Sequence, residues 1–314
     1  MNGIDFSTGL SDGIAWPWPI AVYLFFAGIS GGALAVALLL RLFKQQSGNT
    51  PLLKAATVVA FVTICLGMLC LVLDLTNPLF FWRILVYYNL NSVMSLGVIV
   101  LLIYIPLTAL LLALALQEAL TANSKLAFMA PWLEWLSAWR LPLEKLSLVL
   151  AVAVCAYTGF LISALISFPI INTSLLPALF IVSGLSAGTA MAKMVAVMWF
   201  KEPLHSSDLK LLHGAEWPLM AVEAMFLFML FSGLIFGDAS SQAATQAFVQ
   251  GSWSGLFWFG VVGLGFALPL LANFAFGQRF AHSNKAFYLT GASVVCGMMC
   301  LRLFLLYAGQ IYSF

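Results

Sequence analysis

The chain has 314 residues, of which 63% are hydrophobic and only 8% are charged, and its formal net charge is +2. Soluble domains carry about 25% charged residues. This chain therefore has too little polar surface for a fold surrounded by water, and we expect membrane lipid to be its solvent. The small net charge does not favour nucleic acid as a partner.

Continuous apolar runs follow one another along the chain, and each provides the roughly 20 residues that a membrane-spanning helix needs. The runs are continuous rather than alternating, which argues against strands. The sequence therefore predicts an all-α integral membrane protein with eight transmembrane helices. These helices are predicted at residues 18–42, 54–75, 91–116, 145–167, 175–199, 215–236, 253–275 and 286–311.

Lysine and arginine mark one side of this predicted arrangement. The connections after the first, third, fifth and seventh helices hold ten of them, whereas the two ends and the other connections hold only Arg83. Basic residues stay on the cytoplasmic side, so both termini are predicted to be periplasmic. The ten residues are Arg41, Lys44, Lys54, Lys125, Arg140, Lys145, Lys201, Lys210, Arg279 and Lys285.

Between the third and fourth predicted helices, the segment 130–142 has apolar residues at helical spacing. Tryptophan is favoured at membrane interfaces, so we predict an amphipathic helix that lies flat on the cytoplasmic surface. An irregular loop with chance tryptophans is the alternative. The apolar positions are Trp132, Trp135, Leu136 and Trp139.

Two motifs recur at nearly equal offsets. The segment GISGGA at 28–33 resembles GLSAGT at 184–189, and YTGFLIS at 157–163 resembles YAGQIYS at 307–313. An offset of four helices keeps both halves pointing the same way, which predicts two four-helix bundles related by an axis along the membrane normal. The first would comprise residues 1–144 and 145–167, and the second residues 175–314. The alternative is that glycine and serine are simply common where membrane helices meet.

The sequence does not predict a bound metal, haem or iron–sulfur cluster. The cysteines form no C-x-x-C pair, and we expect them to act as small packing residues. The three histidines fall in cytoplasmic connections or at their edges, away from the depth at which a transmembrane haem needs ligands. The cysteines are Cys65, Cys70, Cys155, Cys296 and Cys300.

Ionisable side chains at membrane depth are costly and are therefore candidates for function. Asp74, at the outer end of the second helix, either bonds the following turn or Arg83, or takes part in proton transfer. Glu216 begins the sixth helix, where a negative group suits the helix dipole. Arg302 must face the protein interior because its charge is permanent, and we expect a structural clamp rather than a site for an acidic partner.

Lys193 in the fifth helix and Glu223 in the sixth are predicted to lie at similar depth. We expect them to form an ion pair, because paired charges are the least costly way to keep either group in lipid. The alternative is a proton path through these two residues that also involves Arg302.

Two tyrosines are predicted near the outer face. Tyr157 lies in the fourth helix, and Tyr23 follows Trp18 by about a turn in the first. With openings at Gly28 and Gly159, they could hold a flat apolar ring with two carbonyl oxygens, because tyrosine offers a hydroxyl donor and an aromatic face. The residues by themselves favour the simpler interpretation of aromatic-belt tyrosines.

Taken together, several segments resemble the NrfD/PsrC family, the membrane subunits of periplasmic nitrite, polysulfide and related reductase systems. The resemblance extends over about residues 16–310. The segments are WPIAVYLF at 18–25, GISGG at 28–32, NPLFFW at 77–82, NSVMS at 91–95, YTGFLISAL at 157–165 and LYAGQ at 306–310.

This resemblance implies eight helices without a prosthetic group, in a bacterial inner membrane. It implies an exchangeable menaquinone near the outer face of the first bundle. It also implies a periplasmic four-cluster, ferredoxin-like iron–sulfur subunit that serves a molybdopterin or multihaem cytochrome catalytic subunit. Tyr157 matches a quinone-contacting tyrosine of the polysulfide branch. Tyr23 stands where that branch has a quinone-contacting histidine, and Asp74 looks like its aspartate. The segments around Tyr157 and in the fifth helix look closer to the nitrite branch, so the terminal acceptor stays open.

We therefore expect a protein that oxidises menaquinol and passes electrons to the iron–sulfur subunit. Tyr157 and Tyr23 would hold the quinone oxygens, and Asp74 would accept a proton. Two alternatives remain. One is a secondary transporter whose helices break at the glycine motifs, and the other is a passive anchor for periplasmic subunits.

Overall fold

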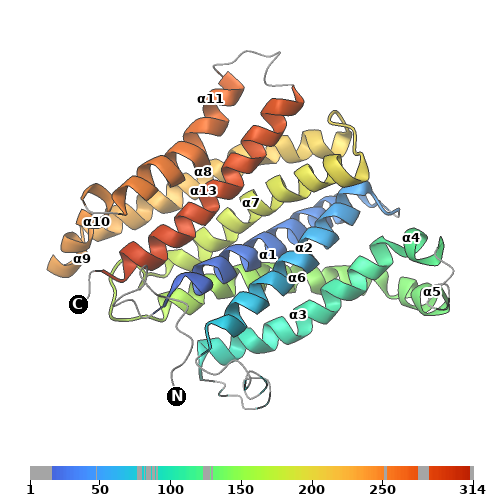
Figure 1. Ribbon diagram of the computed structural model, residues 1–314, viewed down its shortest axis with the longest axis horizontal. Helices are drawn as coiled ribbons and strands as arrows, with labels where there is room; N and C mark the ends of the chain where they lie inside the picture. The colour runs from blue at the N-terminus through green and yellow to red at the C-terminus, as the bar shows by residue number, and fades with distance from the viewer. Residues whose placement is uncertain are drawn as a thin grey trace.

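The computed structural model describes residues 16–46, 48–75, 80, 82, 86, 89, 91–122, 128, 130–250, 253–274 and 283–311. The regular elements in this part of the sequence are all helical (Figure 1). Seven are long and apolar enough to cross a membrane, which confirms seven of the predicted runs. They are α1 (Trp18–Lys44), α2 (Pro51–Leu73), α3 (Val93–Ala115), α6 (Arg140–Ser163), α7 (Leu175–Phe200), α8 (Ser207–Ile235) and α13 (Asn284–Gly309).

The remaining predicted run, 253–275, is also helical but differs in form. It consists of a π-helix, η3 (Leu256–Ala267), continued by α11 (Leu268–Phe274). Its apolar stretch, Leu256–Ala272, is shorter than the other seven. An eighth crossing therefore stays a prediction.

Capping side chains set several helix starts. Thr50 accepts a hydrogen bond from Leu53 N at the start of α2, and Ser206 accepts one from Leu209 N at the start of α8. Such side chains satisfy backbone N–H groups that a helix start leaves unpaired. Because of the cap at Ser206, α8 begins eight residues before the predicted position 215. Its first two turns combine leucines with polar and charged residues, so no continuous apolar run marks them.

The beginning of α1 and the end of α13 lie at the same end of the molecule (Figure 1). Trp16 N donates to Gln310 Oε1 at 3.1 Å, which ties these two points together. The opposite end contains the α1–α2 and α7–α8 connections and the starts of α6 and α13. Eight of the ten basic residues lie there, and Lys125, Arg279 and also Arg83 lie outside the described residues. Which end faces the cytoplasm stays a prediction.

Ion pairs join the helices at the basic end. Arg41 pairs with Glu144 at 2.9 Å, so α1 is linked to α6. Lys44 pairs with Asp208, which links α1 to α8. Lys54, at 2.9 Å from Glu118, links α2 to the short helix α4 (Gln117–Ala122).

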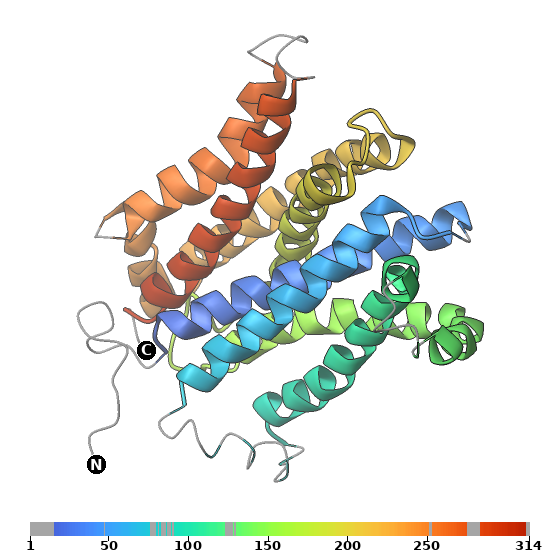
Figure 2. The same cartoon turned by 45° about the vertical axis from the view of Figure 1, so that its right-hand side comes forward.

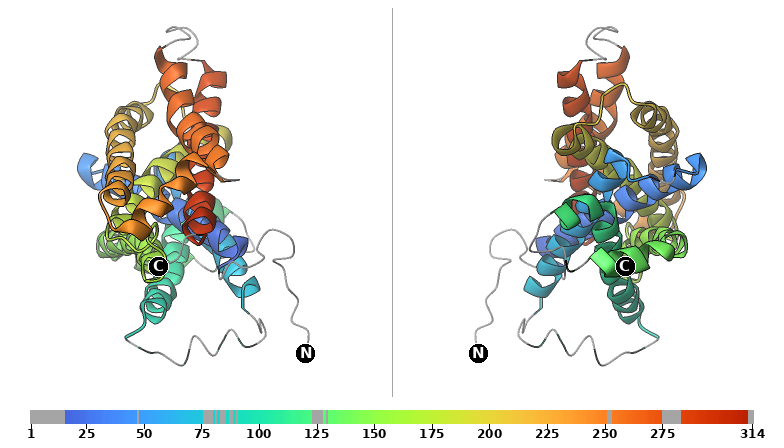
Figure 3. Two further views of the ribbon diagram at one scale, coloured as in Figure 1. Left: turned by 90° about the vertical axis from the view of Figure 1, so that its left-hand side faces the viewer. Right: turned by 90° about the vertical axis from the view of Figure 1, so that its right-hand side faces the viewer.

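The central helices are α1 and α7, with α3 and the η3–α11 helix on opposite flanks (Figures 2 and 3). Contacts in the two halves correspond: α1 packs on α2 and α6 as α7 packs on α8 and α13, and α3 packs on α6 as η3 packs on α13. The two glycine motifs meet in register, since Gly28 lies against Gly184 and Gly32 against Gly188. These contacts agree with a parallel repeat, which remains a prediction.

The segment predicted as amphipathic does contain a helix, α5 (Ala130–Ala138), with α6 starting directly after Trp139. Leu133 is buried, while Trp132, Trp135 and Trp139 are 73%, 62% and 57% exposed. Exposed tryptophans on a short helix suit a membrane interface. Its position on the cytoplasmic surface remains a prediction.

Candidate functional site

The structure brings Tyr23 of α1 and Tyr157 of α6 together. Tyr23 lies five residues from the start of α1 and Tyr157 six from the end of α6, or roughly 8 and 9 Å from the same end of the molecule. Their hydroxyl groups are close enough to interact. Tyr23 is fully buried and Tyr157 is 8% exposed. The pair therefore lies within the helix bundle near this end.

Within this pair, the hydroxyl of Tyr23 is the one that lacks a hydrogen-bond partner among the described residues. It is buried and has no hydrogen bond of standard geometry within the described part of the sequence. Its contact with Tyr157 is therefore better described as a close approach than as a formed hydrogen bond. Buried polar groups are usually paired, so this hydroxyl is a candidate for binding a ligand oxygen.

Gly97 of α3 completes the site, and the sequence analysis did not identify it. A Cβ atom on Gly97 would overlap the ring of Tyr157, so only glycine leaves room for that ring. Gly97 lies four residues from the start of α3, which is about 6 Å from the same end. Its position within the NSVMSLG segment was the only signal that could have pointed to it.

Asp74 lies at the same end but apart from the tyrosines. It caps the C-terminus of α2, and its N–H donates to Cys70 O at 3.2 Å. Gly67, the residue of α2 next to Tyr23, is seven residues earlier, or about 10 Å along the helix. Partial burial raises the pKa of the Asp74 carboxyl above its usual range. The predicted partner Arg83 lies outside the described residues.

The expected openings beside two glycines are filled by protein. A Cβ atom on Gly159 would overlap Pro177 at the start of α7, and one on Gly28 would overlap the side chain of Met298. The prediction that these glycines leave space for a ring is therefore wrong. They allow helices to approach closely instead. Trp18 is half-buried at the start of α1.

The expected Lys193–Glu223 pair is also wrong, since Lys193 pairs with Glu216. Lys193 lies seven residues before the end of α7, and Glu216 lies nine after the start of α8, so the two are level. Glu223 is seven residues deeper, or about 10 Å. The error follows from the misplaced start of α8.

Glu223 lies within electrostatic range of a different cation. It is buried and interacts electrostatically with Arg302 of α13. Arg302 donates to Ser183 Oγ at 2.8 Å and stacks on the ring of Phe180, 3.4 Å from its centroid. These contacts join α13 to α7, as expected of a clamp. The Nε and Nη1 atoms of Arg302 have no hydrogen-bond partner among the described residues.

Three cavities with shared lining residues lie between the basic end and Glu223. The largest has a volume of about 360 Å³. The second, about 30 Å³, shares His213 and Thr290 with the first. The third, about 10 Å³, shares Ser186 and Val294 with the second and is also lined by Glu223. A water needs roughly 10–15 Å³ of such space, so each cavity has about the size for one water or more.

A second buried polar group lies in the first half of the protein. Ser30 of α1 donates to Ala60 O at 2.7 Å, and its Oγ is 2.9 Å from Tyr104 Oη of α3. Tyr104 is fully buried. The sequence analysis missed Tyr104 because α3 reads as uniformly apolar. The Ser30–Tyr104 contact fixes α3 relative to α1, farther than Tyr157 from the end of the bundle that holds the tyrosine pair.

Comparison with known proteins gives consistent results. The family model described as "Polysulphide reductase, NrfD" matches residues 7–313. A polysulfide reductase polypeptide of Wolinella succinogenes is 39% identical over 302 residues, which are 95% of both sequences. Protein NrfD of Escherichia coli (strain K12) is 38% identical over 308 residues, which are 96% of both sequences.

A more distant relative is a selenate reductase subunit of Mesobacillus selenatarsenatis. It is 26% identical, over 92% of this protein and 72% of its own length. The matches to the family model and to the two nearer relatives extend over almost the whole sequence and confirm the resemblance seen in the motifs. With seven apolar helices long enough to cross a membrane, the chain belongs to the NrfD family of multi-pass membrane subunits of reductase complexes.

Proposed function

We propose that this protein is the quinol-oxidising membrane subunit of a respiratory reductase complex in the bacterial inner membrane. It would take electrons from menaquinol near the periplasmic face and pass them to a periplasmic iron–sulfur subunit. The observation that carries this proposal is the approach of Tyr23 and Tyr157 near one end of the bundle. Membership of a family that includes the polysulfide reductase polypeptide of Wolinella succinogenes supports it.

The residues present suit a quinone. The Tyr23 hydroxyl is buried and lacks a standard hydrogen bond within the described residues, so it can bond an oxygen of a ligand. The Tyr157 hydroxyl can bond a second oxygen, and its ring offers a flat face. When bound, menaquinol supplies two electrons and two protons on oxidation.

Each residue then has a defined task. Tyr23 and Tyr157 bind and orient the ligand oxygens within an apolar surrounding that excludes water. Asp74 lies about 10 Å nearer the end of the bundle, so it would receive protons on their way to the outer face rather than at the ring itself. The electrons leave to the iron–sulfur partner, which serves a molybdopterin or multihaem cytochrome subunit.

One alternative is weakened by the helices themselves. A transporter of the parallel-repeat type needs discontinuous helices at its binding site. Both α1 and α7 run without a break through their glycine motifs. The other alternative is a passive anchor, and only measurements of quinol-dependent turnover distinguish it from the proposed function.

The test is a Tyr157→Phe variant of the intact complex. Loss of a hydrogen bond to a buried ligand oxygen costs about 1–3 kcal/mol, so quinol-dependent turnover should fall by roughly five- to a hundredfold. Tyr288→Phe makes the same change on α13 at the basic end and should leave turnover unchanged. Normal assembly with full turnover in Tyr157→Phe would remove this residue from the site.

The cavities favour a second function for the other half of the protein. We propose that protons enter from the basic end past Lys193 and reach Glu223 beside Arg302. The shared linings of the three cavities support this path. In proteoliposomes, Glu223→Gln should lower the membrane potential that accompanies turnover. An unchanged potential at an equal turnover rate would exclude this path.

A further inference from the structure

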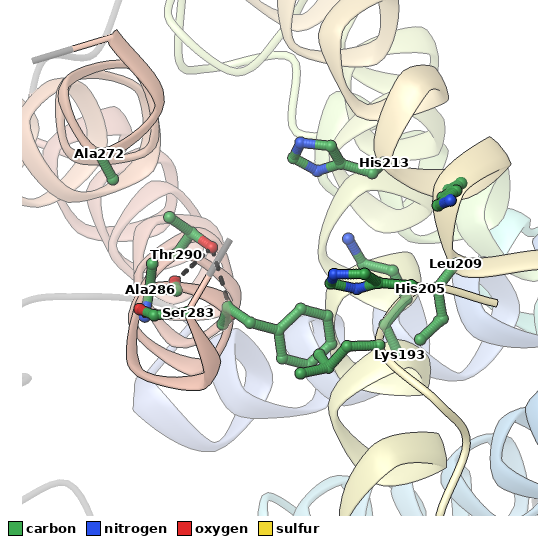
Figure 4. A pocket seen from close by; sticks show the side chains of 11 residues that line it. Lys193, His205, Leu209, His213, Ala272, Ser283, Ala286 and Thr290 are labelled. Atoms are coloured by element: carbon green, nitrogen blue, oxygen red, sulfur yellow. Dashed lines mark hydrogen bonds between the residues drawn. The ribbon is translucent and has the colours of Figure 1, made fainter. Parts of the chain in front are cut away.

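The largest of the three cavities lies at the basic end, between α7, α8, α11 and α13. Figure 4 shows His205, His213 and the amine end of Lys193 on one side of it. The α13 side consists of residues near the start of that helix, including Ser283 and Thr290. This volume of about 360 Å³ is within the range of small-molecule sites.

The charge around this cavity is positive. Lys193 and Lys210 both line it, and none of the described lining residues carries a carboxylate. Glu216 lies behind the lining and pairs with Lys193, which offsets one of the two lysine charges. The rings of His205 and His213 add N–H donors, although His213 Nδ1 already lies 3.0 Å from Glu216 Oε2.

Two helix starts lie at the same cavity. Ser206 caps α8 and Ser283 caps α13, and each cap accepts a backbone N–H three residues later. The positive end of a helix dipole favours an anion within its first turn. The dipoles thus reinforce the lysine charges and point to a ligand of negative charge.

The rest of the lining is apolar. Leu204, Leu209, Ala272 and Phe287 line the cavity together with the polar groups. A ligand that places an anion among the nitrogens could therefore lay carbon atoms against these side chains. Basic pockets between transmembrane helices on the cytoplasmic side bind phospholipid headgroups in this manner.

We propose that this cavity binds a phosphate-bearing anion, supplied either by an anionic phospholipid headgroup or by soluble phosphate. Lys210 and Lys193 provide the charge, and the starts of α8 and α13 provide oriented dipoles. This site is separate from the tyrosine pair, which lies near the other end of the bundle. Its occupation does not require quinol at the tyrosine pair, although it shares Lys193 with the proton path proposed above.

The test uses the intact complex in nanodiscs of phosphatidylcholine. One arm adds cardiolipin and counts the molecules retained by native mass spectrometry. The other arm titrates inorganic phosphate in a phosphate-free buffer and follows the melting temperature. We compare Lys210→Gln and Lys210→Glu with the wild type. Lys145→Gln, which removes an exposed lysine of α6 at the same end, is the matched control.

Removing one lysine charge near a membrane surface should weaken binding by about fivefold, and reversing it in Lys210→Glu should weaken binding further. Because Lys210 is exposed, both variants should assemble with normal quinol turnover. Retained cardiolipin that is lost in these variants identifies a lipid source. Stabilisation by inorganic phosphate that is lost in them identifies a soluble source. Equal binding by the wild type and both Lys210 variants, or no binding in either arm, overturns the proposal.

Discussion

The ring of Tyr157 occupies the space that a side chain on Gly97 would fill. This relationship places α3 and α6 in direct contact at the level where Tyr157 meets Tyr23. The backbone of α3 therefore holds the orientation of Tyr157, in addition to its close approach to Tyr23. Close packing of this kind transmits a change at one position directly to its neighbour.

A Gly97→Ala substitution should therefore displace the Tyr157 ring. A misplacement of about 1 Å at a reacting group can cost on the order of a hundredfold in rate, so we expect turnover with menaquinol to fall by roughly ten- to a hundredfold. Overpacking should also lower the free energy of unfolding by about 1–3 kcal/mol. Steady-state quinol oxidation and thermal unfolding of the purified complex measure the two effects.

Gly233→Ala is the control for this variant. Gly233 lies within α8, and a Cβ atom there would meet no atom within 4 Å. Alanine is about 1 kcal/mol more favourable than glycine inside a helix, so this substitution should preserve turnover and keep or slightly raise the free energy of unfolding. Equal turnover in Gly97→Ala and the wild type would show that the position of Tyr157 does not matter for the reaction.

Gly32→Ala tests the contact between the two central helices. A Cβ atom on Gly32 would overlap the carbonyl of Gly184, which is backbone and cannot rotate away. Helices α1 and α7 would have to separate, and we expect a loss of at least about 1–3 kcal/mol. A lower melting temperature together with easier proteolysis should report this separation. A melting temperature like that of the wild type would mean that α1 and α7 are not packed this closely.

Asp74 provides a pH-dependent prediction. Burial raises the pKa of its carboxyl, so the folded state prefers the protonated acid. Its contribution to stability is therefore complete below the ordinary pKa of about 3.9 and is lost as the pH rises through the raised value. Asp74→Asn should melt higher than the wild type at neutral pH, and this difference should disappear in acid.

The same variant separates structure from function. If Asp74 accepts protons from quinol, Asp74→Asn should lower turnover while it raises the melting temperature. A purely structural Asp74 would leave turnover unchanged. Melting curves between about pH 4 and 7, with the unfolded pKa as the lower reference, and activity at neutral pH supply both readouts.

Several features could be derived from residues alone. Seven of the predicted runs are spanning-length helices because hydrocarbon thickness dictates their length and apolar content. The eight connection lysines and arginines in the described part gather at one end, because they all follow odd-numbered predicted helices, whose ends lie on the same side. Membership of the family followed from motifs distributed over the whole sequence.

Side-chain partners could not be derived in this way. The pairing of Lys193 with Glu216 rather than Glu223 depends on where α8 begins, and a polar capped turn leaves no trace in an apolar run. Gly159 allows α6 to approach the start of α7 closely, and this contact with Pro177 is visible only in the folded structure. Such contacts arise from helix packing, so composition does not encode them.

Residue type and spacing along the sequence were enough to predict that the chain lies in membrane lipid, and to predict seven of its helices. They also predicted the basic end of the bundle and the family. Only the tertiary structure established which side chains contact one another. It brought Tyr23, Tyr157 and Gly97 together, placed Glu223 within electrostatic range of Arg302, and formed a basic cavity between α8 and α13. The physical reason is that a membrane helix exposes a similar apolar surface all round, and close approach at small residues selects the faces that pack.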